Sequence, residues 1–275
     1  MARNSTLVKP EQARMVHAGV VRREQLSPSM LRVTLGGPEL AGITPLGFDQ
    51  WFRLFVPRPG QEEMRLPRDM SLRGYVEYLA MRGSRPLLRN YTFAGFRLDG
   101  DASEVDVDFV VHDAHEGDFT AARWAAECAA GDPVGILDEG LMFAAPGAQD
   151  WTLLAADESG LPAVAGVLAS LPADATGLAL IEVPTPEDIR PLSAPLGMEL
   201  RWLPRAALAD AHDVPGRLAL RTLTEAALPA GRPYAFVVGE SGLPTGARRH
   251  LVSAGVDKQD IAFCGYWKHG ARASK

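Results

Sequence analysis

Residues 89–92 of the chain, Arg-Asn-Tyr-Thr, combine a cation, an aromatic ring and a hydroxyl group within four positions. Residues 89–96 are predicted to form a strand, and side chains on a strand repeat every two residues, so Arg89 and Tyr91 should share one face. A guanidinium can pair with phosphate oxygens, and an aromatic ring offers a flat apolar surface. The spacing therefore suits a ligand with both phosphates and a planar ring. Four such residues also occur in ordinary strands that bind nothing.

Two polar segments follow apolar runs in the second half of the chain. The first follows residues 151–155 (WTLLA), and the second follows residues 234–238 (YAFVV). If both runs are strands of a parallel sheet, the segments lie at strand carboxyl ends, where such sheets bind ligands. The residues that we select there are Asp157, Glu158, Ser159, Gly239 and Glu240. No Gly-x-Gly-x-x-Gly motif occurs in this region, so a nucleotide site here depends on the fold alone.

The elements that must position these residues differ between the two halves. Short strands with Gly and Pro turns are expected at 16–23, 30–35, 51–56, 89–96, 105–111 and 135–137. This pattern predicts a closed antiparallel Greek-key barrel. Residues 58–88 are expected to form a long connection with a short helix near 72–81, and an Ala-rich helix is expected at 120–130.

From residue 151 onward, apolar strands alternate with helices. Strands are expected at 151–155, 177–183, 199–203, 234–238 and 261–264, and helices at 161–171, 218–227 and 244–254. Such alternation predicts a parallel α/β sheet with right-handed crossovers. The change of pattern predicts two domains, residues 1–147 and 148–275.

Bulk properties give no support to several classes of partner, and local basic clusters are a separate matter. The net charge of −6 gives no reason to expect nucleic acid or an anionic membrane. No apolar run approaches the roughly 18 residues needed to cross a bilayer, and residues 1–16 do not resemble a signal peptide. The two distant cysteines, Cys128 and Cys264, suit free thiols in a reducing compartment. We therefore expect a cytoplasmic monomer without stable membrane insertion.

The ordered set of motifs resembles the siderophore-interacting proteins, which are FAD-dependent ferric-siderophore reductases among the ferredoxin-reductase-like flavoenzymes. The resemblance covers some 240 residues. The segments that carry it are 26–35 (LSPSMLRVTL), 89–92 (RNYT), 107–112 (VDFVVH), 121–125 (AARWA), 131–132 (GD), 156–163 (ADESGLPA), 182–184 (EVP), 239–240 (GE), 248–251 (RRHL) and 265–270 (GYWKHG).

The resemblance implies an FAD site in the first domain. It implies that Arg89 pairs with the FAD phosphate, Tyr91 packs on the isoalloxazine and Thr92 bonds near flavin N5; no catalytic acid or base is implied. Further residues expected at the site are Asp108, Val110, His112, Thr120, Ala121 and Ala122, the last three at a helix start that suits phosphate. A structural role for His112 and a plain packing helix at 120–130 are the alternatives.

Some residues depart from the family pattern. Ala94 stands where the family usually carries arginine, and Asp138 and Glu139 replace a neutral turn. Acids close to an anionic cofactor predict weaker FAD binding.

The resemblance also implies an electron donor and a substrate. NAD(P)H is expected at the sheet's carboxyl edge, where Glu182 could hold a ribose hydroxyl and favour NADH, or be only a solvated strand end. Ferredoxin is the alternative donor. A ferric siderophore is expected on a basic surface formed by Arg248, Arg249 and Lys268, which could equally be ordinary surface charges. Tyr266 and Trp267 are expected beside the flavin. No cluster of His, Cys or carboxylates predicts an iron site of the protein's own.

Two other functions stay open from the sequence. One is a general flavin-linked reductase of quinones, nitro compounds or free flavin. The other is a non-catalytic protein that binds a siderophore or another small molecule on a degenerate flavin fold.

Overall fold

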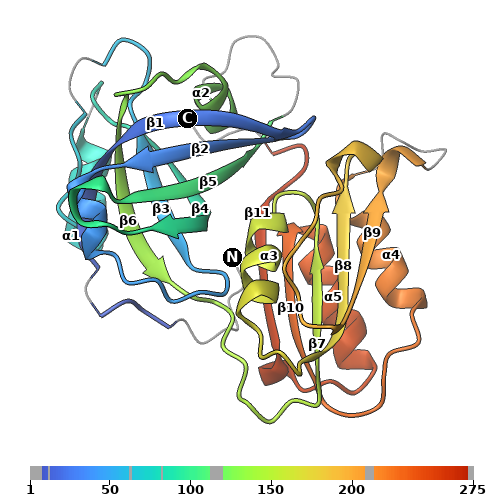
Figure 1. Cartoon of the computed structure of the whole chain (residues 1–275). Helices are drawn as coiled ribbons and strands as arrows, with labels where there is room; N and C mark the ends of the chain where they lie inside the picture. Colours follow the sequence, from blue (N-terminus) through green and yellow to red (C-terminus); the bar gives the residue numbers. More distant parts are fainter. Residues whose placement is uncertain are drawn as a thin grey trace. The chain divides into compact units, whose positions relative to one another are not determined.

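The computed structural model describes residues 8–11, 13–61, 64–81, 83–111, 120–207 and 214–271. The chain divides into two compact units (Figure 1). The barrel unit contains Lys9–Leu46 and Gln50–Leu141, and the sheet unit contains Gly47–Asp49 and the chain from Met142 onward. Within the described residues, no helix is long and apolar enough to cross a membrane.

In the described part of the barrel unit, six antiparallel strands close in the order β1-β2-β5-β4-β3-β6. Their bounds are β1 Met15–Ser27, β2 Met30–Gly36, β3 Trp51–Val56, β4 Leu87–Arg97, β5 Glu104–Val110 and β6 Pro133–Gly140. Alternate apolar side chains fill the interior, among them Val33, Phe52 and Val107, all with 0% exposure. Because β3 lies between β4 and β6, and β2 between β1 and β5, the connections are of the Greek-key type. The predicted barrel is confirmed.

In the part of the barrel unit that the structure describes, two helices accompany the strands, α1 (Leu72–Ala80) and α2 (Ala121–Glu127), with short 3-10 turns η1 (Pro38–Gly42) and η2 (Gly100–Ala102). Thr120 is the N-cap of α2, as expected, because its side-chain oxygen accepts the N–H of Arg123 at 3.1 Å. The helix ends before the predicted residue 130. The carboxylate of Asp132 accepts the N–H of Ala129 at 2.9 Å, and this turn replaces the next helical hydrogen bond.

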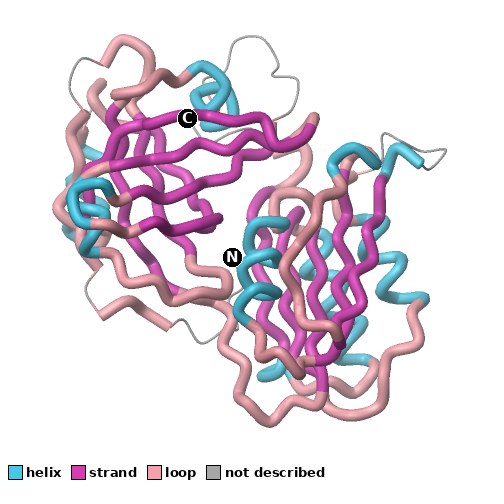
Figure 2. The backbone as a smooth tube through the Cα atoms, viewed as in Figure 1, coloured by secondary structure: helices cyan, strands magenta, loops and turns pink. Residues whose placement is uncertain are grey.

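The described part of the sheet unit holds five parallel strands in the order β11-β10-β7-β8-β9. They are β7 Trp151–Ala156, β8 Thr176–Val183, β9 Gly197–Pro204, β10 Pro233–Glu240 and β11 Ile261–Trp267. The helices are α3 Leu161–Ser170, α4 Arg217–Glu225 and α5 Gly242–Ser253, with 3-10 turns η3 Pro186–Asp188, η4 Arg205–Ala207 and η5 Lys258–Asp260. Helices α4 and α5 pack on one face and α3 lies on the other (Figures 1 and 2). The predicted α/β sheet is confirmed.

A short excursion, Gly47–Asp49, belongs to the sheet unit although it lies between barrel elements in the sequence. The Asp49 carboxylate is 1% exposed and accepts the N–H groups of Met142 at 3.1 Å and Phe143 at 2.8 Å. Burial raises the pKa of Asp49 to about 6, although these hydrogen bonds act in the opposite direction.

Asp49 should make stability depend on pH. Its folded pKa exceeds its unfolded value, so its contribution is fully present below about pH 4 and is lost as pH rises to about 6. Asp49→Asn should therefore reduce the decline in unfolding free energy between pH 4 and 6.5, by up to about 3 kcal/mol. Urea denaturation across this pH range would measure the unfolding free energy of each variant. Asp174→Asn, at an exposed aspartate, is the control. Parallel profiles for Asp49→Asn and wild type would contradict the assignment.

Candidate functional site

The segment that carries Arg89 to Thr92 lies beside a gap in the barrel's hydrogen-bond ladder. Strand β4 pairs with β3 along Leu87–Thr92, but it pairs with β5 only from Phe93 onward. The end of β5, Asp108–Val110, pairs with β2 alone. Among the described residues, strand β4 therefore presents an unpaired backbone edge at this point, where N–H and C=O groups are available to a ligand.

The side chains on this segment suit an anionic planar ligand. Arg89 is half-buried, and its Nη1 donates to the Leu88 carbonyl oxygen at 2.7 Å. It has no carboxylate partner among the described residues. The half-buried Tyr91 ring lies 4.4 Å from the Phe109 ring, centroid to centroid. Burial raises the pKa of Tyr91, so its hydroxyl stays neutral.

Thr92 is buried and lies opposite Trp51, whose indole Nε1 is also buried and has no hydrogen-bond partner in the described structure. A buried donor without an acceptor is uncommon in folded proteins. An uncommitted guanidinium, an unpaired strand edge and an orphaned N–H all call for an acceptor-rich ligand, and FAD is such a group. The residues present therefore fit FAD.

Helix α2 closes the aromatic side of this region. Trp124 of α2 packs against Phe109 with ring centroids 5.8 Å apart. Ala121 is buried and Ala122 is half-buried, so only small side chains stand at the helix start. Val110 is the last residue of β5 and is half-buried. His112 lies outside the described residues, and its role stays a prediction.

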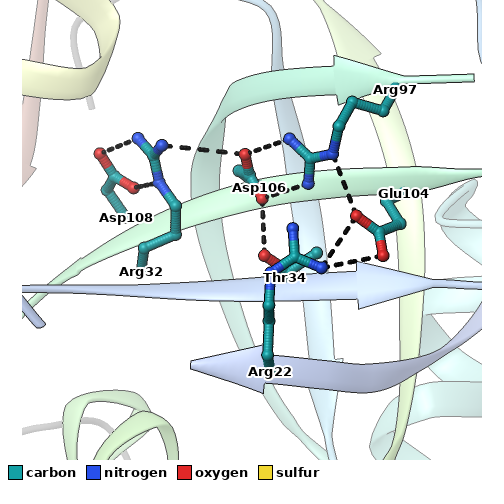
Figure 3. A network of polar contacts seen from close by, with 7 residues as sticks. All are labelled: Arg22, Arg32, Thr34, Arg97, Glu104, Asp106 and Asp108. Carbon is teal, nitrogen blue, oxygen red and sulfur yellow. Dashed lines mark hydrogen bonds and ion pairs between the residues drawn. The ribbon is translucent and has the colours of Figure 1, made fainter. Parts of the chain in front are cut away.

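Asp108 has a partner within the barrel (Figure 3). Arg32 grips its carboxylate with two hydrogen bonds, from Nε at 2.7 Å and from Nη2 at 3.0 Å. These bonds raise the pKa of Arg32. Beside them, burial alone would raise the pKa of Asp106, but hydrogen bonds from Arg97 and Thr34 lower it on balance. Cofactor binding by Asp108 stays a prediction, and its carboxylate already serves this cross-strand network.

The acids that depart from the family pattern also have partners inside the barrel. Asp138 accepts a hydrogen bond from Gln50 Nε2 at 2.8 Å, and burial raises its pKa. Glu139 forms ion pairs with Arg53 at 2.6 Å and with Lys9. The charge of Glu139 is thus compensated locally, which weakens the reason for expecting poor FAD binding.

In the sheet unit, Asp157 joins the turn after β7 to the end of β10. The carboxylate has 0% exposure and accepts the Ser159 N–H at 2.9 Å, the Ser159 hydroxyl at 2.5 Å and the Glu240 N–H at 2.6 Å. Burial raises its pKa to about 6. From β7 the chain runs outward to β8 and β9, then returns to β10 on the other side. Asp157, Ser159, Gly239 and Glu240 therefore meet at the topological switch point, where such sheets bind ligands.

Gly239 is required here for two reasons. Its φ is +133°, and a Cβ atom at this position would lie 2.7 Å from the Asp157 carboxylate carbon. We expect Gly239→Ala to destabilise the protein by at least about 2 kcal/mol. Gly255→Ala is the matched control: its φ is +93° but nothing lies within 4 Å, so only backbone strain of about 1 kcal/mol applies. Equal losses in urea denaturation would show that the Asp157 contact is unimportant.

Glu240 ties the start of α5 to the chain after β11. Its carboxylate accepts the N–H groups of Gly242 at 2.6 Å and His269 at 3.1 Å, and the Ser241 hydroxyl at 3.0 Å. Burial alone would raise its pKa, but these hydrogen bonds lower it on balance, so the carboxylate stays ionised. The segment that it fixes follows the half-buried Tyr266 and Trp267. The Trp267 Nε1 is buried and lacks a hydrogen-bond partner among the described residues.

Arg205, which the sequence reasoning missed, joins Glu158 to Glu182. Its guanidinium lies 2.6 Å and 2.8 Å from the two Glu158 oxygens and 3.1 Å from Glu182 Oε1. Glu182 also accepts the N–H groups of Gly216 and Ala219 at the start of α4. Glu182 has 0% exposure, so it is not a solvated strand end. The one available signal was the position of Arg205, directly after a strand at the carboxyl edge.

The three predicted substrate cations occupy two places. The Arg248 guanidinium lies over the Phe263 ring, 5.0 Å from its centroid, and its Nε is buried without a hydrogen-bond partner in the described region. The neighbouring Arg249 is exposed on α5. Lys268 is exposed five residues beyond Phe263, just after the carboxyl end of β11. Lys268 is therefore the one at the ligand-binding edge of the sheet.

Family models match both halves of the chain. The siderophore-interacting FAD-binding domain matches residues 19–142, and the siderophore-interacting protein model matches residues 149–270.

Individual relatives agree with these matches. The ferric vibriobactin reductase of Vibrio cholerae is 29% identical over 91% of this chain and 88% of its own. The NADPH-dependent ferric-chelate reductase of Escherichia coli is 28% identical over 90% of this chain and 91% of its own. The crystal structure of a siderophore utilization protein from T. fusca superposes with a TM-score of 0.79 at 32% identity and covers 98% of both chains.

Proposed function

The chain belongs to the siderophore-interacting protein family, and on that premise we propose that it is an FAD-dependent reductase of ferric siderophores with NADPH as electron donor. The observation that carries the proposal is the uncommitted Arg89 guanidinium beside Tyr91 on the unpaired edge of β4. We assign FAD binding to residues 1–147 and the electron donor to residues 148–275.

The proposed division of labour follows from the positions of the side chains. Arg89 would hold the phosphates, Tyr91 would support the flat face of the ring, and the Thr92 hydroxyl would bond at its polar edge. Bound FAD would supply hydride acceptance and single-electron release. The chain need only bind and orient the reactants, because electron transfer to a chelated iron requires no general acid or base.

The donor and the substrate are inferred from chemistry and from relatives. The relative from Escherichia coli carries NADPH in its name. Arg205 and backbone amides already bind the Glu182 carboxylate, which weakens the argument for NADH. Ferredoxin remains the alternative donor. Ferric iron would arrive already chelated: no group of three or more His, Cys, Asp or Glu among the described residues could hold a metal.

An anaerobic absorbance experiment tests the proposal. The purified chain, supplied with FAD, should retain a flavin spectrum after gel filtration. NADPH should bleach it, and a ferric siderophore should restore it with release of Fe(II). A correctly folded, colourless protein that cannot be reconstituted with FAD would reject the proposal. Faster turnover of quinones than of any ferric chelate would indicate a general flavin-linked reductase instead.

Lys268 should matter for an anionic ferric chelate. Neutralising one exposed cation near a substrate site removes attraction that speeds encounter. We expect Lys268→Gln to lower kcat/KM for an anionic chelate about fivefold at low salt, while a neutral quinone is reduced as before. The matched control is Lys258→Gln, another exposed lysine of the same unit. Equal effects of Lys268→Gln on both acceptors, or none on either, would remove Lys268 from the substrate site.

A further inference from the structure

Helix α1 exposes an unusual amount of apolar surface. Its side chains Leu72, Tyr75, Val76 and Leu79 are 82, 45, 58 and 46% exposed, and they are half of the large exposed hydrophobic residues in the described chain. Their spacing of i, i+3, i+4 and i+7 places them on one stripe of the helix. Contiguous apolar surface of this kind marks an interaction site more often than isolated exposed residues do.

The opposite face fixes the helix on the barrel. Tyr78 is buried against Phe55, with ring centroids 6.1 Å apart, and its hydroxyl donates to the Pro86 carbonyl oxygen at 2.9 Å. Gly74 is buried against the chain that precedes the helix, where a Cβ would lie 2.1 Å from the Asp69 carbonyl oxygen. With Tyr78 facing the barrel, the exposed side chains of Leu72 and Val76 face outward.

The chain segment that contains this stripe carries net positive charge. Residues 57–88 contain six arginines and four acidic residues, within a chain of net charge −6. Arg65, Arg68 and Arg73 are exposed, and none of them has an ion-pair partner among the described residues. The local charge is therefore opposite in sign to that of the whole chain.

We propose that the outer stripe of α1, with Arg65, Arg68 and Arg73, docks the protein on an anionic lipid bilayer. An interfacial helix buries its apolar stripe at the boundary between headgroups and acyl chains, while arginines bind lipid phosphates. Tyrosine is favoured at this depth. The nine residues of α1 span only about 13 Å, so the helix lies on the bilayer and does not cross it.

A lipid surface fits these residues better than an acidic soluble protein does. Leu72, Val76 and Leu79 are aliphatic and protrude from one short helix. Binding at a bilayer surface scales with buried apolar area and with attraction to anionic lipids, and it needs no shape-matched partner surface. The proposal is independent of the reductase assignment, because the residues that carry it lie apart in sequence from the proposed flavin and substrate residues.

Vesicle binding tests the proposal with the full-length, FAD-supplied protein. Wild type should partition at least tenfold more strongly onto vesicles of equal phosphatidylglycerol and phosphatidylcholine than onto pure phosphatidylcholine, and 0.5 M salt should weaken this binding. Leu72→Gln/Val76→Gln should lower the partition constant on anionic vesicles at least tenfold, and Arg68→Gln/Arg73→Gln about tenfold. Reductase activity without vesicles should be unchanged in both.

Matched controls come from the sheet unit. Ile189→Gln/Leu196→Gln removes two exposed aliphatic side chains, and Arg221→Gln/Lys258→Gln removes two exposed cations; neither should change partitioning. The proposal is overturned if wild type does not bind anionic vesicles, or if α1 variants and controls weaken binding equally. It is also overturned if the stripe instead forms a dimer, seen by light scattering, that Leu72→Gln/Val76→Gln dissociates. Each variant should unfold at the same thermal midpoint as wild type, which would show that it is folded and that misfolding does not explain a change in binding.

Discussion

Replacing Arg89 with alanine is expected to weaken FAD binding between about tenfold and 100-fold, because a charge-assisted hydrogen bond to phosphate contributes about 1.5–3 kcal/mol. The same change should alter the stability of the FAD-free protein little. In the described structure Arg89 donates only to the neighbouring Leu88 carbonyl and pairs with no carboxylate. An arginine held in this way contributes little to folding and is available to a ligand.

The measurement is a flavin-fluorescence titration of the FAD-free protein. Arg89→Lys should fall between wild type and Arg89→Ala, because lysine keeps the charge but loses the planar fork of donors. Arg23→Ala, which removes an exposed arginine from β1, should leave FAD affinity unchanged. If Arg89→Ala binds FAD as tightly as wild type does, Arg89 is no phosphate ligand. If it loses stability as much as affinity, Arg89 is structural.

Arg205→Met should destabilise the sheet unit by about 3–5 kcal/mol, the usual cost of leaving buried carboxylates without their cation. Glu158 and Glu182 are 1% and 0% exposed, so neither can recruit water in place of the guanidinium. Arg201→Met is the matched control, because it breaks an exposed pair with Glu199 on the same strand. Exposed pairs contribute little, so the control should unfold at nearly the wild-type urea concentration.

Two further measurements separate the charge effect from lost packing. Adding Glu158→Gln and Glu182→Gln to Arg205→Met should recover part of the stability, since no buried charge remains. The deficit of Arg205→Met should also be smaller at pH 5 than at pH 8. Burial already raises the pKa of Glu182, and losing the cation would raise it further, so protonation relieves the buried charge as pH falls. If the loss of stability in Arg205→Met depends neither on pH nor on the glutamine substitutions, lost packing alone explains it.

The order of strands and helices was predictable because it depends on local periodicity. Strand β3 runs from Trp51 to Val56 as expected, and β7 extends the predicted run by only one residue, Ala156. Strand β6 was underestimated: Pro133–Gly140 replaces the expected residues 135–137. Its additional residues include Asp138 and Glu139, which are poor strand formers but are held by Gln50 and Arg53 from β3 and its flank.

Helix α1 shows a different limit of prediction from sequence. Its existence was expected, but its apolar residues cover most of the helix circumference, a pattern that ordinarily predicts burial. Burial instead reaches only Gly74 and Tyr78. The barrel offers one packing surface, and the rest of the helix stays outside it.

The sequence by itself determined the barrel, the parallel sheet and the candidate residues at strand ends, because alternation and apolar runs are local signals. Only the tertiary structure decided which of those residues are committed to partners inside the chain. Arg205 reaches Glu158 across 47 positions, and Arg32 reaches Asp108 across 76, whereas Arg89 is left uncommitted. The physical reason is that a charge's role depends on its neighbours in space and its exposure to water, and neither is encoded by spacing along the chain.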